Sequence, residues 1–459
     1  MDRFRRFGAD DCFSTASAPL QHRQTHHSPA CVSFARIIVF VELGPLCVLH
    51  SAFVTLPTSA IQSSGIMERR TKSSEQRYLE LIAGPPKSMG SRLLRSILRV
   101  ASWGYWVGIT FRNLLFDVGT KRSHAIPVPV ISVGNLTTGG TGKTPTVALL
   151  VDLLQGLGHR PGIISRGYRE LSAGGNDEAR VLEMLCPGTP HVQNRDRVAA
   201  AREVAATRDM TATGQAGADQ TCTVILADDA FQHRRLKRDL DIVLIDALNP
   251  WGHGALLPRG LLREPVSGLR RADVVILTRA DLVDAATRQS IRQIVQAVNQ
   301  TAAVVELAFE PAGLVDKLGV QRPIEDSGSA ISSNGESSNN PVGASINAPS
   351  PESGTLAFCG IGNPDGFRRT LAAAGISVLD LVAFPDHHHY EPSDLRELTE
   401  SAQKMSATSL MTTVKDLVKI QPEWADSVPL FALNIKAEVI TGRAALDEVL
   451  ARIKQPPTR

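Results

Sequence analysis

Short runs of Val, Ile and Leu recur along the middle of the chain, each bounded by glycine, proline or polar residues. The runs with the length and β-branched content of buried strands are residues 128–135, 161–165, 223–227, 241–245 and 273–277. Stretches with helical spacing, such as 146–157 and 195–206, lie between some of them. Buried strands that alternate with helices predict an α/β fold with a parallel sheet covered on both faces.

Residues 1–66 are polar and irregular except for an apolar stretch at 32–54, which is interrupted by Arg36, Glu42, Pro45 and His50. A spanning helix needs few charges, and a signal-peptide core is shorter and ends at small residues. We therefore interpret 1–66 as a poorly ordered leader, or as a segment that is not translated if synthesis begins near Met67. A membrane span over 32–54 remains the alternative.

Residues 91–116 are apolar, with arginines at helical spacing on one side and several aromatic residues: Arg92, Arg95, Arg99, Trp103, Tyr105, Trp106 and Phe111. The charge-free part is about a dozen residues, shorter than the roughly 20 that a spanning helix needs. This pattern predicts an amphipathic helix at a membrane interface, within a membrane-associating segment over 67–122. The alternative is a helix packed on the protein's own core with the arginine stems directed outward.

Residues 325–354 are rich in Ser, Asn, Gly and Pro and bury too little apolar surface to order themselves, so we predict a disordered insertion. Beyond this tract, apolar runs at 355–359, 376–384 and 409–414 predict a smaller C-terminal α/β domain over 355–459.

Composition narrows the function classes. The net charge of +3 is too small for a dedicated nucleic-acid binder, so no nucleic acid is expected as a partner. The cysteines form no CxxC pair, which argues against a zinc site or a disulfide framework and fits a reducing cytoplasm: Cys12, Cys31, Cys47, Cys186, Cys222 and Cys359. No feature indicates an obligate protein partner.

The strongest chemical signal is the segment TTGGTGKT, between the strand at 128–135 and the helix that follows. Glycines in such a loop let backbone N–H groups point at phosphate oxygens, the lysine reaches the β- and γ-phosphates, and the final hydroxyl can bind Mg²⁺. The first glycine of the usual motif is replaced by Thr137. A chance match on a protein that binds no nucleotide is the alternative. The predicted ATP-binding residues are Thr137, Thr138, Gly139, Gly140, Thr141, Gly142, Lys143 and Thr144.

A second signal is Asp228-Asp229, at the end of the strand predicted over 223–227. Carboxylates at the carboxyl edge of a parallel sheet can hold the Mg²⁺ that bridges nucleotide phosphates. Adjacent strand residues point to opposite faces, so at most one faces the metal directly unless the chain has already turned into a loop. A solvated acidic turn is the alternative.

Two weaker segments complete the candidate chemistry. Asp177 and Glu178 follow a Gly-Gly turn, where a carboxylate could accept a proton from an acceptor hydroxyl, although a helix cap is the plainer interpretation. In FPDHHHY, residues 384–390, consecutive histidines cannot converge on one ion without a contorted backbone. We expect one of them to tune proton transfer beside a carboxylate, with a plain surface loop as the alternative.

An ordered set of motifs resembles the tetraacyldisaccharide 4'-kinase family, from about Tyr78 to the C-terminus. The set is GNLTTGGTGKTP, SRGY, NDEA, DDAFQHRRLKRDLDIV, LLPRGLLREP, TRAD, FCGIGNPDGF, FPDHHHY and TTVKD. The resemblance implies a P-loop kinase domain over 123–324 that uses ATP and Mg²⁺. It implies transfer of the γ-phosphate to the 4'-hydroxyl of an acylated glucosamine disaccharide 1-phosphate, giving lipid IVA. It also implies work at the cytoplasmic face of a bacterial inner membrane, as a peripheral or monotopic protein.

The resemblance also assigns residue roles. Asp177 matches the catalytic base and His387 its partner, with His388 as a one-residue alternative. Metal ligands would come from Thr144, Asp228, Asp229 and Glu178, and contacts with substrate or phosphate from Arg197, Gln232 and Glu264.

The chain departs from the family pattern at three places. DDAFQ stands for DDGFQ, which matters if Ala230 needs a positive φ. LPRGLLREP stands for LPAGPLREP and puts Arg259 and Leu262 near the expected rim of the active site. Val414 stands where the family has glutamate, which weakens any role expected for that loop.

Two other functions are compatible with a phosphate-binding loop. A P-loop GTPase or metallochaperone would prefer guanine and carry a metal-binding cluster. A membrane-recruited nucleotide-binding adaptor would bind ATP tightly and transfer no phosphate.

Overall fold

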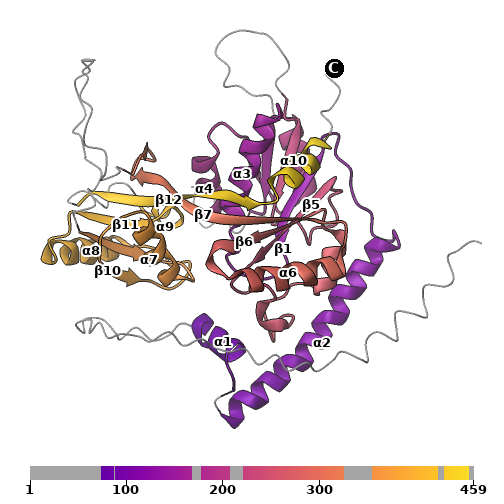
Figure 1. Ribbon diagram of the computed structural model, residues 1–459, viewed down its shortest axis with the longest axis horizontal. Helices are drawn as coiled ribbons and strands as arrows, with labels where there is room; N and C mark the ends of the chain where they lie inside the picture. The colour runs from indigo at the N-terminus through magenta and orange to yellow at the C-terminus, as the bar shows by residue number, and fades with distance from the viewer. Residues whose placement is uncertain are drawn as a thin grey trace, which may run out of the picture. The chain divides into compact units, whose positions relative to one another are not determined.

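The computed structural model describes residues 74–86, 88–167, 177–206, 221–324, 354–421 and 428–453 (Figure 1). The predicted leader 1–66 and nearly all of the predicted insertion 325–354 lie outside these residues. The helices are α1 Ser74–Ala83, α2 Met89–Asp117, α3 Lys143–Gly156, α4 Asp177–Leu185, α5 Arg197–Ala206, α6 Ala285–Val298, α7 Pro364–Ala373, α8 Pro392–Lys404, α9 Val414–Leu417 and α10 Arg443–Ala451, with short 3₁₀ turns at Gly252–Gly254, Val266–Arg271 and Ala280–Leu282.

The strands form one sheet in the order β10-β9-β11-β12-β7-β6-β5-β1-β4-β2-β3, with β8 paired to β7. They are β1 Val130–Asn135, β2 Pro161–Ser165, β3 His191–Gln193, β4 Val224–Asp228, β5 Leu240–Asp246, β6 Val274–Thr278, β7 Ala303–Asp316, β8 Gln321–Arg322, β9 Thr355–Cys359, β10 Val378–Ala383, β11 Ser409–Thr413 and β12 Leu430–Thr441. Neighbours pair in parallel except that β7 is antiparallel to β12 and β8. The predicted α/β class with a largely parallel sheet is confirmed.

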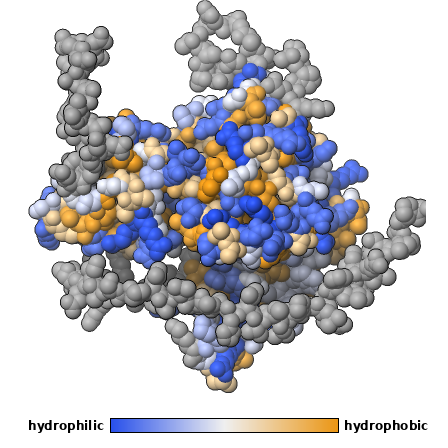
Figure 2. Space-filling model, viewed as in Figure 1, coloured by the Kyte–Doolittle hydropathy of each residue, from blue (hydrophilic) through white to orange (hydrophobic). Residues whose placement is uncertain are grey.

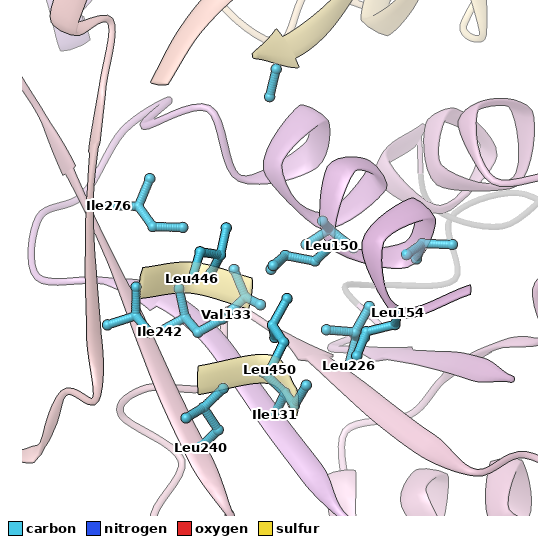
Figure 3. Close-up of a cluster of buried hydrophobic side chains, with 14 of the residues drawn as sticks. Ile131, Val133, Leu150, Leu154, Leu226, Leu240, Ile242, Ile276, Leu446 and Leu450 are labelled. Atoms are coloured by element: carbon cyan, nitrogen blue, oxygen red, sulfur yellow. The ribbon is translucent and has the colours of Figure 1, made fainter. Parts of the chain in front are cut away.

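Both faces of the sheet are buried around β1, which explains the uninterrupted apolar runs. On one face, alternate strand side chains pack against α3 and α10 (Figure 3): Ile131, Val133, Leu226 and Ile242 meet Leu150, Leu154, Leu446 and Leu450. On the other face, the intervening positions pack against α5 and α6. The helices therefore hold the strand ends, and the loops that follow them, in fixed positions.

The C-terminal strands are covered by α8 and α9 on one face and by α7 on the other. Two long antiparallel strands, β7 and β12, connect these C-terminal strands to the strands around β1. Phe431 pairs with Asp316 at one end of β12, and Thr441 pairs with Glu306 at the other. After β12 the chain forms α10, whose Leu446 and Leu450 are completely buried in the hydrophobic core around β1 and α3. The residues predicted as a C-terminal domain over 355–459 therefore do not pack only with one another.

Helix α2 carries its apolar side chains outward. It begins at a capping box in which Ser88 and Ser91 each bond the other's backbone N–H. Its polar residue Ser102 is buried, whereas large apolar side chains on the same helix are exposed: Leu93, Leu94, Ile97, Val100, Trp103, Trp106, Val107, Phe111 and Leu114. Figure 2 shows hydrophobic and hydrophilic residues side by side at the N-terminal end of this helix. Among the described helices, none has the length and apolar character to cross a membrane.

Candidate active site

The loop between β1 and α3 has the backbone of a phosphate-binding loop. Gly139 and Gly142 adopt positive φ angles of 108° and 80°, and Lys143 is the first residue of α3. A Cβ atom at Gly142 would lie 2.2 Å from the Phe309 ring, so any other residue would need both a strained backbone and a shifted ring. The predicted strand, loop and helix are therefore confirmed as a structural unit, at the carboxyl edge of a parallel sheet.

Two neighbouring segments hold this loop. Thr278 Oγ1 donates to the carbonyl of Thr141 at 3.0 Å, and Arg279 Nη2 donates to the carbonyl of Gly140 at 2.7 Å. The N–H of Thr138 donates to the carbonyl of Leu261 at 2.8 Å. Because Thr278 at the end of β6 and the adjacent Arg279 already bind two carbonyl oxygens of the loop, these carbonyls stay turned away from a phosphate, which backbone N–H groups would bind.

Asp228, at the end of β4, is a buried carboxylate with one oxygen atom that lacks a partner among the described residues. Its Oδ1 atom has no hydrogen-bond partner among the described residues. Burial raises the pKa of Asp228 to about 6, although the Lys143 charge opposes this shift. A buried, unsatisfied carboxylate oxygen beside a phosphate-binding loop suits a hard cation such as Mg²⁺.

Asp229 has a different environment from its neighbour. It leaves the strand with a φ of 48° and lies 3.7 Å from Lys143 Nζ, and Arg263 Nη1 donates to both of its oxygens at 2.8 and 3.0 Å. Burial alone would raise its pKa, but Lys143 and Arg263 lower the pKa of Asp229 below its ordinary value. Asp229 is thus an ionised, paired carboxylate. Ala230 does not need the positive φ, so alanine is accommodated at that position.

The first turn of α4 lies near these carboxylates. The charge of Glu178 contributes to the raised pKa of Asp228, so the two side chains interact electrostatically. Asp177 is the first residue of α4 and is half-buried, and Glu178 is exposed. In the described part of the chain, no three His, Cys, Asp or Glu side chains gather as metal ligands. Mg²⁺ usually takes one or two carboxylates plus substrate phosphates, so Thr144 and Asp228 fit such a site.

Two residues predicted as phosphate or substrate contacts support the backbone. Arg197 is buried, and its Nη2 donates to the carbonyls of Asp228 and Asp229 at 2.9 and 2.8 Å. Gln232 Nε2 donates to the backbone carbonyl of Asn135 at 2.9 Å, and the backbone carbonyl of Gln232 accepts from Arg112 of α2. Both side chains hold the strand ends in place around the site.

The carboxylate of Glu264 is held by α2 and by the 3₁₀ turn at Val266–Arg271. It is completely buried, and its Oε2 accepts from Arg271 at 2.9 Å and from Asn113 at 3.2 Å. Its Oε1 has no partner among the described residues. The buried carboxylate supports the packing of α2, and a contact with substrate remains a prediction.

The histidine loop follows β10, in the C-terminal part of the sheet. His388 packs inward, since its Nε2 lies 2.8 Å from Asp394 and its ring stacks on Phe384. His387 has a φ of 59°, its N–H donates to the carbonyl of Gly360, and its side chain is exposed. The geometry therefore favours His387 over His388 for a role toward substrate, and that role remains a prediction.

Some supporting residues were not identified from the sequence. Arg263 and Arg279 stand within the LLREP and TRAD motifs, but no local spacing indicates which acid or carbonyl each would meet. Arg259 contacts α1 rather than the rim of the site, since its Nη1 donates to the carbonyl of Ile82 at 3.3 Å. Asp416 is completely buried and binds the N–H of Gly360 at 3.0 Å and Lys419 at 2.9 Å. The TVKD loop therefore keeps a structural role.

Comparison with known proteins identifies the relatives of this chain. Residues 94–455 match the family model described as tetraacyldisaccharide-1-P 4'-kinase. A tetraacyldisaccharide 4'-kinase from Syntrophus aciditrophicus is 36% identical, covering 78% of this chain and 92% of that relative. One from Halothermothrix orenii is 33% identical, covering 76% and 88%.

A solved structure agrees with these sequence matches. The "apo" form of LpxK from Aquifex aeolicus in complex with ATP has 28% sequence identity and a TM-score of 0.57, covering 78% of this chain and 99% of that one. The sheet, the phosphate-binding loop and these matches lead to one conclusion: the chain belongs to the tetraacyldisaccharide-1-P 4'-kinase family.

Proposed function

We propose that this enzyme transfers the γ-phosphate of ATP to the 4'-hydroxyl of tetraacyldisaccharide 1-phosphate, which yields lipid IVA. The observation that carries the proposal is that Lys143, Asp228 and Asp229 lie together at one sheet edge, where one buried oxygen of Asp228 has no partner among the described residues. Phosphoryl transfer needs positioning and charge neutralisation at such an edge more than covalent chemistry. The related kinases act on the same class of acceptor, as their names state.

Each residue at the site has a separate role in the proposed phosphoryl transfer. Lys143 neutralises charge on the transferred phosphoryl group, and its ion pair with Asp229 keeps the ammonium group near the loop. Asp228 and Thr144 would hold Mg²⁺, which supplies further charge neutralisation when bound. Asp177 orients the acceptor hydroxyl and accepts its proton, with exposed His387 as its partner across the site.

The substrate keeps its acyl chains in a bilayer, so the enzyme must work at a membrane surface. The exposed apolar face of α2, together with its arginines, is suited to the headgroup region of the cytoplasmic leaflet. A soluble monomer rarely exposes so large an apolar surface without a partner. Localisation at the cytoplasmic face of the inner membrane is therefore part of the proposal.

A direct assay tests this function. Purified enzyme is incubated with γ-labelled ATP, Mg²⁺ and the disaccharide 1-phosphate lipid in neutral detergent, and the lipid fraction is examined for label. A labelled lipid that depends on Mg²⁺ is expected. Tight ATP binding with no labelled lipid would favour the adaptor, and preference for GTP with lipid-independent hydrolysis would favour a GTPase.

A further inference from the structure

A cavity of about 470 Å³ opens between α2, the chain that follows α1, and the loop that carries Arg259. Its lining includes Arg92, Arg95, Arg99 and Arg259, with Trp103 beside them. The candidate active site shares none of these residues.

The arginines converge for identifiable reasons. Arg92, Arg95 and Arg99 are three and four residues apart on α2, which places them on one side of the helix. Arg259 joins them because its N–H donates to Ser102 Oγ at 3.0 Å and its Nη1 donates to the carbonyl of Ile82. Arg95 donates to the carbonyls of Leu81, in the last turn of α1, and of Gly84, just after that helix. Neutral carbonyl groups therefore fix the two inner guanidinium groups.

Among the described residues that line the cavity, none is acidic. None of the four arginines forms an ion pair with a described Asp or Glu. Burial, and then the charges of Arg95 and Arg99, lower the pKa of Arg259. An anion in the cavity would relieve this repulsion, and guanidinium groups suit phosphate oxygens especially well.

The surroundings indicate what the rest of the ligand is like. Leu93, Ile97 and Val100 are exposed on the same helix, and Trp103 is 63% exposed at the edge of the cavity. Tryptophan with aliphatic neighbours is typical of the boundary between headgroups and acyl chains. A ligand that is anionic at one end and apolar at the other fits both halves of this surface.

We propose that this cavity binds the phosphate of an anionic phospholipid headgroup. Arg92 and Arg99 contact the phosphate oxygens, while Arg95 and Arg259 shape the cavity and add charge. The proposal rests on the proposed function in one respect, because both place α2 at a membrane surface. The 1-phosphate of the substrate has the same chemistry and is a separate outcome of the test.

The test compares two charge-matched double variants of the full chain. Arg92→Gln/Arg99→Gln removes the outer pair of cavity arginines and leaves the carbonyl-bonded pair intact. Arg369→Gln/Arg396→Gln removes the same charge from exposed positions on α7 and α8. Each protein is sedimented with phosphatidylcholine vesicles, with or without added phosphatidylglycerol, and the KM for the lipid substrate is measured in neutral detergent. Equal melting temperatures establish that both variants fold.

Wild-type protein should bind vesicles with phosphatidylglycerol more tightly than vesicles of phosphatidylcholine alone. In the cavity variant, the ratio of these two affinities should fall about tenfold or more. The control variant should lose much less, and the KM should stay unchanged in both. An equal loss in the control would mean diffuse attraction without a site and would overturn the proposal, as would an unchanged preference in the cavity variant. A raised KM with the vesicle preference retained would reassign the cavity to the substrate's phosphate. Failure of the proposed function would appear separately, as a wild-type enzyme that sediments with anionic vesicles but labels no lipid.

Discussion

Arg279 donates a guanidinium N–H to the carbonyl of Gly140, 2.7 Å away in the phosphate-binding loop. The same guanidinium group pairs with Asp246 at the end of β5, at 2.8 and 2.5 Å. The loop is therefore tied to the ends of two central strands. This tie fixes the loop's shape before a nucleotide arrives, which reduces the ordering that binding requires.

Arg279→Ala should raise the KM for ATP about tenfold or more, with a smaller change in kcat, because loop positioning is lost while the reacting groups remain. Arg279→Lys keeps the charge but cannot bridge two acceptors, so its KM for ATP should lie between the values of wild type and Arg279→Ala. Arg443→Ala, which removes an exposed pair with Asp447, is the control. A larger fall in kcat than rise in KM would contradict a positioning role.

Gly142→Ala should weaken ATP binding and lower the free energy of unfolding by about 1–3 kcal/mol. The positive φ of 80° and the Phe309 ring both oppose a Cβ atom at this position. Adding Phe309→Ala should relieve the clash but not the backbone strain. The double variant should therefore recover only part of the ATP affinity that Gly142→Ala loses. Gly104→Ala in α2, where a Cβ atom meets nothing within 4 Å, is the matched control. ATP titration and urea unfolding measure both effects.

Asp228→Asn should stabilise the metal-free enzyme while it abolishes the stabilisation by Mg²⁺ and ATP. The pKa of Asp228 is about 6 in the folded protein, against an ordinary value of 3.8. The protonated carboxyl therefore contributes to the free energy of unfolding below about pH 4, and this contribution is lost as the pH rises through 6. Above pH 7 the variant should exceed wild type by about 1–3 kcal/mol. Urea unfolding at pH 5 and pH 8, with and without Mg²⁺ and ATP, measures this, and undiminished stabilisation by Mg²⁺ would exclude Asp228 as a ligand.

The same group makes Mg²⁺ affinity depend on pH. Below about pH 6 the metal must displace a proton from Asp228, so the apparent affinity should fall by up to tenfold per pH unit. Above pH 7 it should level off. Mg²⁺-dependent shifts in melting temperature report this without an activity measurement.

Asp177→Ala should reduce phosphate transfer by about a hundredfold or more and leave ATP affinity nearly unchanged, because only the acceptor's proton transfer depends on it. Glu183→Ala, an exposed acid on the same helix, is the control. Transfer and ATP binding are measured on the same preparations. Unchanged turnover in the Asp177 variant would remove this residue from the mechanism.

Local patterns predicted the central sheet and the phosphate-binding loop because those features depend on short stretches of chain. The runs at 161–165 and 273–277 became β2 and β6, within a residue at their ends. Strand β7 was missed because Glu306, Glu310 and Pro311 interrupt its apolar character, and its stability comes from pairing with β12, far along the chain.

The same limit applies to the site. Lys143 and Asp228 stand in recognisable local motifs, so the sequence identified them. The partners of Arg279 and Arg263 are other loops brought together by the sheet, and no spacing within one segment specifies them. The inward turn of His388 depends likewise on Phe384 and Asp394 together.

The Tyr105 hydroxyl of α2 donates to the carbonyl of Arg263 at 2.9 Å, and Arg263 in turn pairs with Asp229 beside Lys143. Helix α2 is consequently more than the proposed membrane-binding element, since it also supports the residue that neutralises a carboxylate of the nucleotide site. Truncating it would disturb both the nucleotide site and the proposed attachment to a bilayer. Substitutions restricted to its outward side chains are the way to separate the two.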